Sequence, residues 1–205
     1  MYCYSIYMSY NRESFLQAVK TQVEPKIFKH SLALEACMGG LYDYVQQQGQ
    51  LSVDEPSRDA WTLAGLIHDI DYSGEYKEQH PTKTVEVLAT YGLAIPESVL
   101  QIVRAHAPKR TGVQPNSKAQ WAIFCADSIT GLIMAVALIL PSKKLADVQL
   151  KSVLKRFLKE PNFAAGTRRD EVAQCSNAEG LHMPLEKFIE VCLISMQRIA
   201  LNVDL

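Results

Sequence analysis

The sequence predicts an all-α fold, and three observations indicate it. Hydrophobic residues recur at helical spacing along most of the 205 residues, while no run of four or more shows clean strand alternation between turns. Prolines stand where helices would begin or stop, as at Pro25, Pro81, Pro96 and Pro141. With 48% hydrophobic and 21% charged residues, the chain has enough apolar surface for a sizeable core.

The expected helices follow from local signals along the chain. Asn11 suits the cap of a short amphipathic helix, and Pro25 permits the start of a longer one. Pro81 suits the first turn of a helix that stops before Gly92, and Asp147 suits the cap of a basic helix. The expected spans are residues 11–22, 26–48, 58–69, 81–91, 96–106, 117–140, 148–159, 168–179 and 184–200.

The chain is expected to divide at Pro141, after its most apolar segment. Residues 1–140 would form one helical domain, and residues 141–205 a helical extension packed on it. Residues 121–140 are long enough to span a membrane, but Asp127 lies near their middle, where an acid is costly in lipid. We therefore expect a buried central helix in place of a membrane span.

Composition limits the partners and the compartment. The formal charge of −1 and the pI near 6.5 do not mark the whole chain as a nucleic-acid or membrane binder. The five cysteines are widely spread and contain no C-x-x-C pair, so free thiols in a reducing cytoplasm are expected. The first residues lack the features of a signal peptide, and Met8 begins a more ordinary cytosolic start, so residues 1–7 are interpreted as an extension.

Six candidate metal ligands occur in a fixed order along the chain. Imidazole nitrogens and carboxylate oxygens suit iron, manganese, zinc and other divalent ions. Six such groups are too many for one closed tetrahedral site, but they suit two metals that share a bridging carboxylate. The alternative for any His–Asp pair is a buried hydrogen bond. The six are His30, His68, Asp69, His80, His106 and Asp127.

The positions of these residues on helices restrict the geometry. Neighbouring residues on a helix point about 100° apart, so His68 and Asp69 reach one ion only at a helix edge or end. The turn signal “DYSG” comes just after them and favours a site at the helix end. Asp127, Thr130 and Gly131 share one helix face, and the small glycine leaves room for a ligand.

The basic residues have two interpretations each. Beside a metal site they would hold a phosphate, arginine as a bidentate clamp and lysine as a point charge. In the alternative they are simply solvated. The choice stays open for Arg104, Lys109 and Arg110, and for Arg168 and Arg169 after “AAGT”. A solvated face is expected for the helical stripe of Lys151, Lys155 and Lys159.

Three other polar residues also keep alternatives. His80 lies in the polar stretch “YKEQHPTK”, where a solvated side chain is the alternative to a metal ligand. His182 is expected to be structural or exposed. Asp71 has three open roles: it would orient His30 or His68, contact the substrate, or cap the helix.

These motifs resemble those of the HD superfamily of metal-dependent phosphohydrolases. “AGLIHDID” is similar to the family's HDIG segment, with Asp71 in place of its glycine. The order H…HD…H…H…D resembles the dinuclear branch, and the likeness extends from His30 to Leu140. The segments “PSKKLADVQLKSVLKRF” and “FAAGTRRDE” resemble an HDIG-domain group whose members mostly lack an assigned substrate. No “GYP” signature points to a cyclic-dinucleotide enzyme.

The resemblance implies an HD-domain helical bundle over residues 1–140, which binds metal, with extra C-terminal helices. In that family His30, His68, Asp69 and Asp127 would hold a first ion, Asp69 would bridge, and His80 and His106 would hold a second. The implied activity is a metal-dependent phosphohydrolase acting on a nucleotide or other small phosphate ester. One or two divalent ions, from iron, manganese, zinc, nickel, cobalt or magnesium, would activate a water.

The expected roles follow from this resemblance. Asp69 and His68 would be catalytic, and the substrate would contact Arg104, Lys109, Arg110 and Thr130. The alternatives are a regulatory or non-catalytic nucleotide-binding module and a dinuclear-iron oxygenase. The expected partner is a small phosphorylated substrate, without a membrane or a strong nucleic-acid signal, and a homodimer stays open.

Overall fold

The computed structural model describes residues 10–203. This part contains helices and no β-strand, which confirms the predicted all-α class. The extension expected over residues 1–7 and the start at Met8 lie outside the described residues. The α-helices are α1 (Arg12–Gln22), α2 (Pro25–Gln47), α3 (Arg58–Ile67), α4 (Thr84–Thr90), α5 (Glu97–Ala105), α6 (Pro108–Thr111), α7 (Lys118–Ile139), α8 (Leu150–Lys159), α9 (Arg169–Ala173) and α10 (Leu185–Gln197). The 3-10 helices are η1 (Gly74–Gln79), η2 (Leu145–Asp147), η3 (Gln174–Ser176) and η4 (Ala200–Asn202).

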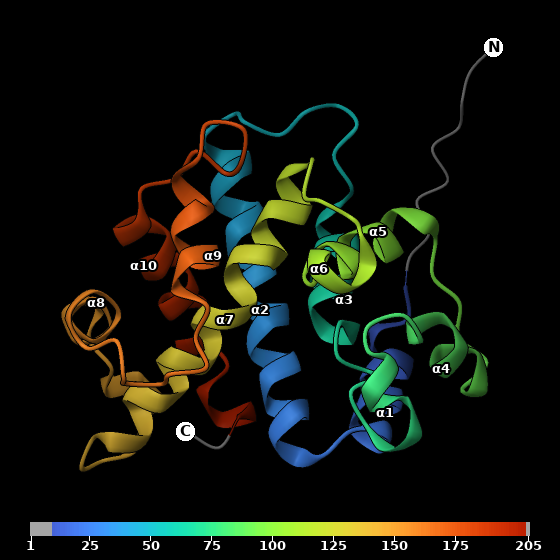
Figure 1. The fold of residues 1–205 in the computed structure, drawn as a ribbon, viewed down its shortest axis with the longest axis horizontal. Helices are drawn as coiled ribbons and strands as arrows, with labels where there is room; N and C mark the ends of the chain where they lie inside the picture. The colour runs from blue at the N-terminus through green and yellow to red at the C-terminus, as the bar shows by residue number, and fades with distance from the viewer. Residues whose placement is uncertain (1–9, 204–205) are drawn as a thin grey trace.

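The two longest helices, α2 and α7, pack against each other at the centre of the bundle (Figure 1). On one side, α3 packs on α2, and α5 packs on both α3 and α7. On the other side, α10 packs on α2, while α8 and α9 pack on α7. The buried apolar side chains form one cluster from Phe15 to Val203, so the C-terminal helices share the core of the earlier ones.

The central position of α7 follows from its composition. By length and composition alone α7 is apolar enough to cross a membrane, with a mean hydropathy of 2.2 over its most apolar window. However, 61% of that window is buried inside the molecule, and Asp127 lies in the middle of the helix. This burial accords with the expected central helix of a folded core.

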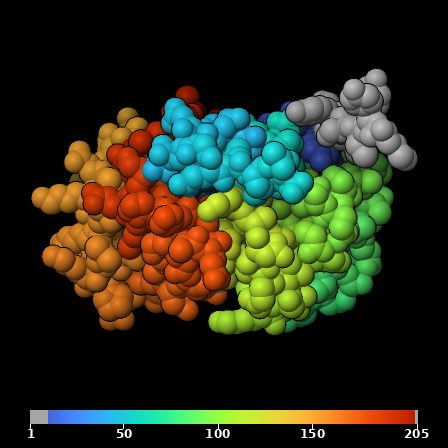
Figure 2. Space-filling model, turned by 90° about the horizontal axis from the view of Figure 1, so that it is seen from above, coloured from blue at the N-terminus to red at the C-terminus, as the bar shows by residue number. Residues whose placement is uncertain are grey.

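The connection between α2 and α3 caps the beginning of α7. The Glu55 carboxylate accepts hydrogen bonds from the backbone N–H groups of Ala119 at 2.7 Å and Lys118 at 3.3 Å. Figure 2 shows this connection (cyan) beside the segment that leads into α7 (yellow-green). A carboxylate at a helix N-terminus satisfies N–H groups that the helix leaves unpaired. The cap therefore fixes the point at which α7, and with it Asp127, enters the core.

The helix expected over residues 81–91 was placed too early. It begins only at Thr84, because η1 and the turn after it occupy residues 74–83. The Asp71 carboxylate accepts the backbone N–H of Lys83 at 2.7 Å, directly before the first helical residue. Pro81 therefore belongs to the turn and does not lie in the first turn of the helix.

Two C-terminal expectations were also wrong. Asp147 does not cap α8: it ends η2, and Val148 is extended before α8 begins at Leu150. The helix expected over residues 168–179 breaks into α9 and η3, because the chain turns back and the backbone N–H of Met183 bonds to Cys175 O at 3.0 Å. In both places a local turn competes with the helix that the periodicity favours.

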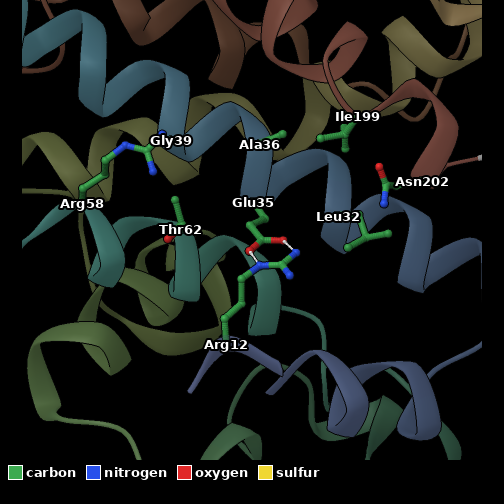
Figure 3. A pocket seen from close by; sticks show the side chains of 9 residues that line it. All are labelled: Arg12, Leu32, Glu35, Ala36, Gly39, Arg58, Thr62, Ile199 and Asn202. Carbon is green, nitrogen blue, oxygen red and sulfur yellow. Dashed lines mark hydrogen bonds and ion pairs between the residues drawn. The ribbon is translucent and has the colours of Figure 1, made fainter. Parts of the chain in front are cut away.

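An ion pair joins α1 to α2. The nearly buried Glu35 carboxylate accepts two hydrogen bonds from the Arg12 guanidinium, at 2.5 and 2.8 Å (Figure 3). Both residues line a cavity of about 350 Å³ together with Arg58, which is itself paired with Asp43 at 2.7 Å. Because the charged side chains lining this cavity already hold partners, we interpret the contact as structural.

We expect Gly65→Ala to destabilise the bundle. A Cβ at this position would meet backbone atoms of Leu34 and Glu35 at 3.0 Å, so α2 and α3 would have to move apart. Overpacking of this kind costs about 1–3 kcal/mol, and urea unfolding followed by circular dichroism measures it.

The matched control is Gly131→Ala in α7. Nothing lies within 4 Å of the new methyl group there, so helix propensity should add roughly 1 kcal/mol of stability. Equal free energies of unfolding for the two variants would contradict the close contact between α2 and α3.

Candidate metal centre

The six expected ligands converge between α2, α3, α5 and α7. Two of them stand directly after a helix, His68 after α3 and His106 after α5. α3 thus ends at Ile67, two residues earlier than expected, and Asp69 leaves the helical path beside His68. Because Asp69 lies outside the helix, its side chain and that of His68 need not point about 100° apart, as neighbours on a helix do. The remaining ligands are His30 in the second turn of α2, His80 after η1 and Asp127 in α7.

Backbone carbonyls orient two of the imidazole rings. His68 donates its Nδ1–H to Gly65 O at 2.8 Å, and His106 donates its Nδ1–H to Val103 O. Since a carbonyl oxygen can only accept, Nδ1 carries a proton in both rings, which leaves Nε2 as the nitrogen that can bind metal. The helix ends therefore present both rings with the nitrogen that can bind metal facing inward.

Side chains orient the other two rings. His80 donates its Nδ1–H to Asp71 Oδ1 at 2.7 Å, so Asp71 orients a histidine that was not among its expected partners. Thr130 donates its hydroxyl proton to Asp127 O at 2.6 Å and accepts the Nδ1–H of His30 at 3.0 Å. Thr130 is fully buried, and this contact differs from the substrate contact expected for it. Such outer hydrogen bonds fix the tautomer and direction of metal ligands.

The four Nε2 atoms face one another in two pairs. The distance is 3.1 Å between His30 and His68, and 3.1 Å between His80 and His106. Two neutral rings in this arrangement direct lone pair at lone pair, which is unfavourable without a cation or a proton between them. Ligands that bind one ion at roughly 2.1 Å are separated by roughly 3.0–3.4 Å. The pairs therefore have the spacing of two metal positions.

The Asp69 carboxylate lies between the two pairs. Its Oδ2 atom is 3.3 Å from His68 Nε2 and 3.8 Å from His30 Nε2. Its Oδ1 atom is 3.3 Å from His80 Nε2 and 3.9 Å from His106 Nε2. Each carboxylate oxygen thus serves a different histidine pair, and both groups of ligand atoms are compact enough to hold a metal ion.

Asp127 adds a second carboxylate to one of these groups. Its Oδ1 atom is 3.0 Å from His30 Nε2 and 3.9 Å from His68 Nε2. The first group therefore has four donors, whereas the group around His80 and His106 has three among the described residues. A group with three protein ligands leaves positions open for water or substrate.

The charges of the site support a cation. Burial lowers the pKa of His68, but the Asp69 and Asp127 carboxylates outweigh it and raise the pKa to about 9. Burial, together with the charge of His68, lowers the pKa of His106 to about 4. Burial raises the pKa of both carboxylates, yet His68 and His30 bring these pKa values below their usual range. The two acids remain charged in a buried place, and a divalent ion fits this donor set.

A cavity of about 530 Å³ opens over the ligands, a volume that suits a small molecule. Lys109 and Arg110 line it from α6, and Arg110 donates to His80 O at 2.7 Å. Arg104 is not among the lining residues, and its nearest acid is Glu97 at 3.4 Å. The structure therefore brings two of these three basic residues to the cavity, because α6 turns away from the end of α5.

Arg168 and Arg169, which were expected either to reach the site or to be solvated, have different partners in the structure. Arg168 reaches the cavity, where it donates to Asp127 Oδ2 at 2.6 Å and to Glu171 Oε2. Burial lowers the pKa of Arg168, but the two acids outweigh it and raise this pKa above its ordinary value. Arg169 instead donates to backbone carbonyls, including Phe163 O at 2.6 Å.

Ile27, Tyr72 and Glu171 also line the cavity and were not expected there. The i, i+3 spacing of Arg168 and Glu171 is a signal for such an ion pair. The sequence carries no comparable signal for Ile27 and Tyr72, since the course of the backbone brings them to the cavity. The expected surface residues are exposed: His182, Lys151, Lys155 and Lys159.

An all-α bundle with a partly buried set of four histidines and two aspartates has the features of a helical metal-binding domain. Residues 27–132 match the HD domain family, and this match covers just over half of the chain. The chain therefore belongs to the HD domain family, a superfamily of metal-dependent phosphohydrolases, which confirms the resemblance. Comparison with curated proteins and with solved structures gave no match.

We expect the affinity for divalent metal to fall as pH is lowered. The metal-free protein holds a proton on His68 up to about pH 9, and an ion has to displace it. Release of one proton makes the apparent Kd rise about tenfold for each pH unit below that value. Titration with Mn²⁺ at pH 7, 8 and 9 measures this, and equal affinity at all three would show that His68 is already neutral.

The raised pKa of His68 also predicts how the free energy of unfolding of the metal-free protein changes with pH. The folded pKa of His68 lies above the ordinary value of 6.5, so the ion pairs stabilise the fold below about pH 6.5. This contribution is lost as pH rises through about 9. After chelation, the contribution of His68 to the free energy of unfolding should therefore decline between pH 6.5 and 9, and denaturant unfolding measures it. A free energy of unfolding that stays constant over this range would contradict a charged His68.

Proposed function

We propose that the protein is a metal-dependent phosphohydrolase that uses two divalent ions to hydrolyse a nucleotide or another small phosphate ester. One observation carries the proposal: the two oxygens of Asp69 face two different histidine pairs, at 3.3 Å from His68 Nε2 and 3.3 Å from His80 Nε2. A shared carboxylate of this kind is what a two-metal hydrolytic site requires.

The donor atoms divide into two metal positions. His30, His68, Asp127 and Asp69 Oδ2 would hold the first ion, and His80, His106 and Asp69 Oδ1 the second. Four imidazoles favour iron, manganese, zinc, nickel or cobalt over magnesium, which prefers oxygen ligands. When bound, such ions lower the pKa of a water and polarise a phosphoryl oxygen.

The side chains of the cavity would bind and orient the substrate. Lys109 and Arg110 lie on the side of the three-donor group, and their positive charge offsets that of a phosphate. Arg110 is fixed by its hydrogen bond to His80 O, so it needs little reorganisation to receive an anion. Asp69 and His68 would act as metal ligands at the reacting centre, and this is the catalytic role that we propose for them.

The compartment and partner follow from the same features. We place the protein in a reducing compartment such as the cytoplasm, because the four cysteines of the described part are free and buried. Burial raises the pKa of the Cys175 thiol to about 12, so this thiol is inert at neutral pH. The proposed partner is the small phosphorylated substrate.

Asp69→Ala should abolish hydrolysis and remove most of the bound metal, because it deletes the donor that both positions share. Elemental analysis of gently purified protein gives the ions per chain, and phosphate release from nucleotides and sugar phosphates gives the activity. His182→Ala is the control, since this histidine is exposed and outside the cavity. Similar behaviour of the two variants would refute the site.

The outcome of the wild-type screen separates the alternatives. Two bound ions with nucleotide binding but no phosphate release would indicate a regulatory module. Iron-dependent consumption of oxygen would indicate an oxygenase. Either result would overturn hydrolysis while leaving the metal centre in place.

His80→Ala should lower saturating metal from two ions per chain towards one, since it removes one of three donors at the second position. His30→Ala should weaken the other position.

Asp71→Ala leaves all donors present but frees the His80 ring, and we expect about 10–100-fold weaker binding at the second position only. A wild-type titration that saturates at one ion would remove the two-ion interpretation.

A further inference from the structure

A second cavity, which is shallow and open to solvent, has a volume of about 350 Å³ and adjoins the metal cavity. Part of its wall comes from the segment before α9, which lies outside residues 27–132, so membership of the HD family assigns it no role. The two cavities share His30, Asp127 and Arg168. The other walls of the second cavity are Ser128, Gly131, Ala164, Ala165, Gly166 and Thr167.

Arg168 stands at the junction of the two cavities. Asp127 and Glu171 hold its guanidinium from two directions, and they use two of its five N–H donors. The side chain remains 43% exposed, so the rest of the group is accessible from the cavities. A guanidinium held in this way is prepared to bind a phosphoryl oxygen without further ordering.

Ser128 and Gly131 form the α7 side of the second cavity. Ser128 is buried, and its hydroxyl has no hydrogen-bond partner among the described residues. Because the oxygen itself has hardly any exposed surface, a ligand in the cavity does not reach it, and the α7 wall is small and closed there. A Cβ on Gly131 would meet nothing within 4 Å, so the space beside this glycine is open.

The opposite wall is held rigidly by Arg169. This side chain donates to the carbonyl oxygens of Phe163 at 2.6 Å, Phe157 at 3.1 Å and Glu160 at 3.2 Å. These bonds fasten the segment before α9 to the end of α8, and Ala164 has a left-handed φ of 47°. The wall and the adjacent Arg168 are therefore preformed and need no closure to reach the metal centre.

We propose that the second cavity binds the alcohol part of the substrate, a hydroxyl-bearing group such as a sugar, while Arg168 contacts the phosphoryl group at the junction. The proposal rests on the proposed function, which places the phosphoryl group over the metal centre. The walls contributed by this cavity alone are small and uncharged, and Thr167 adds a polar side chain. Such walls suit a compact polar group better than a second phosphate or a stacked base.

The test uses binding of two phosphonates to the full chain loaded with Mn²⁺. Methylphosphonate lacks an alcohol part, and the other probe is ribose 5-phosphate with a CH₂ group replacing the ester oxygen. Neither is hydrolysed, so calorimetric binding is independent of whether the protein turns over esters. Phosphate release from the corresponding esters tests the proposed function separately. We expect the ribose probe to bind wild-type protein at least about tenfold more tightly than methylphosphonate.

Two variants test the second cavity. Gly131→Leu should remove most of the advantage of the ribose probe, while the affinity for methylphosphonate and the metal content stay unchanged. Thr167→Val covers the case in which the leucine variant does not fold, since it replaces a hydroxyl of the cavity wall by a methyl group of similar size. It should weaken the ribose probe about threefold to tenfold and leave methylphosphonate unaffected.

Arg168→Gln tests the junction and should weaken both phosphonates about 10–100-fold. Arg198→Gln is the matched control, because this arginine is exposed at the end of α10 and lines neither cavity. Equal affinity of both probes for wild-type protein, or no binding of either, would overturn the subsite. Unchanged affinity in Arg168→Gln would overturn the role of this arginine.

Discussion

The site depends on a single electrostatic constraint: lone pairs and negative charges converge in a buried place and need a cation among them. The Nε2 atoms of His30 and His68 lie 3.1 Å apart, with the Asp69 and Asp127 carboxylates beside them. In the metal-free protein the Asp69 and Asp127 carboxylates raise the pKa of His68 to about 9, so a proton on His68 supplies the positive charge. Two ions would supply positive charge at both histidine pairs, whereas the proton on His68 serves only one of them.

The close packing of α2 against α3 brings the metal ligands together. Gly65 has two functions, since its missing side chain lets α2 approach α3 at the backbone and its carbonyl accepts the Nδ1–H of His68. The close approach brings His30, on α2, next to the end of α3. Because α3 stops at Ile67, His68 and Asp69 both turn toward the same point. A small loss of contact between two helices would therefore also disturb the ligands, which links the stability of the fold to the metal centre.

Sequence reasoning reached the ligands but not all of their supports. A site near the ends of these two helices was predictable, because an apolar run followed by turn residues marks where a helix stops, although α3 ends two residues earlier than expected. The partner of Asp71 was not, since the turn that brings His80 to it depends on η1 and on the cap of α4. Likewise, Arg168 reaches Asp127 across 41 positions of sequence, and no local period records such a contact.

The C-terminal part of the chain reaches the metal ligands of the HD part. The matched family segment ends at residue 132, yet Asp127 within it holds Arg168 from beyond it. Arg169 anchors the same segment through backbone carbonyls, so one arginine holds the wall while its neighbour enters the cavity. The ligands that would activate water thus belong to the shared HD part, whereas a wall of the adjoining cavity belongs to the C-terminal part. Under the proposed function, substrate choice would vary through the segment before α9 without any change in the metal ligands, because different parts of the chain carry the two tasks.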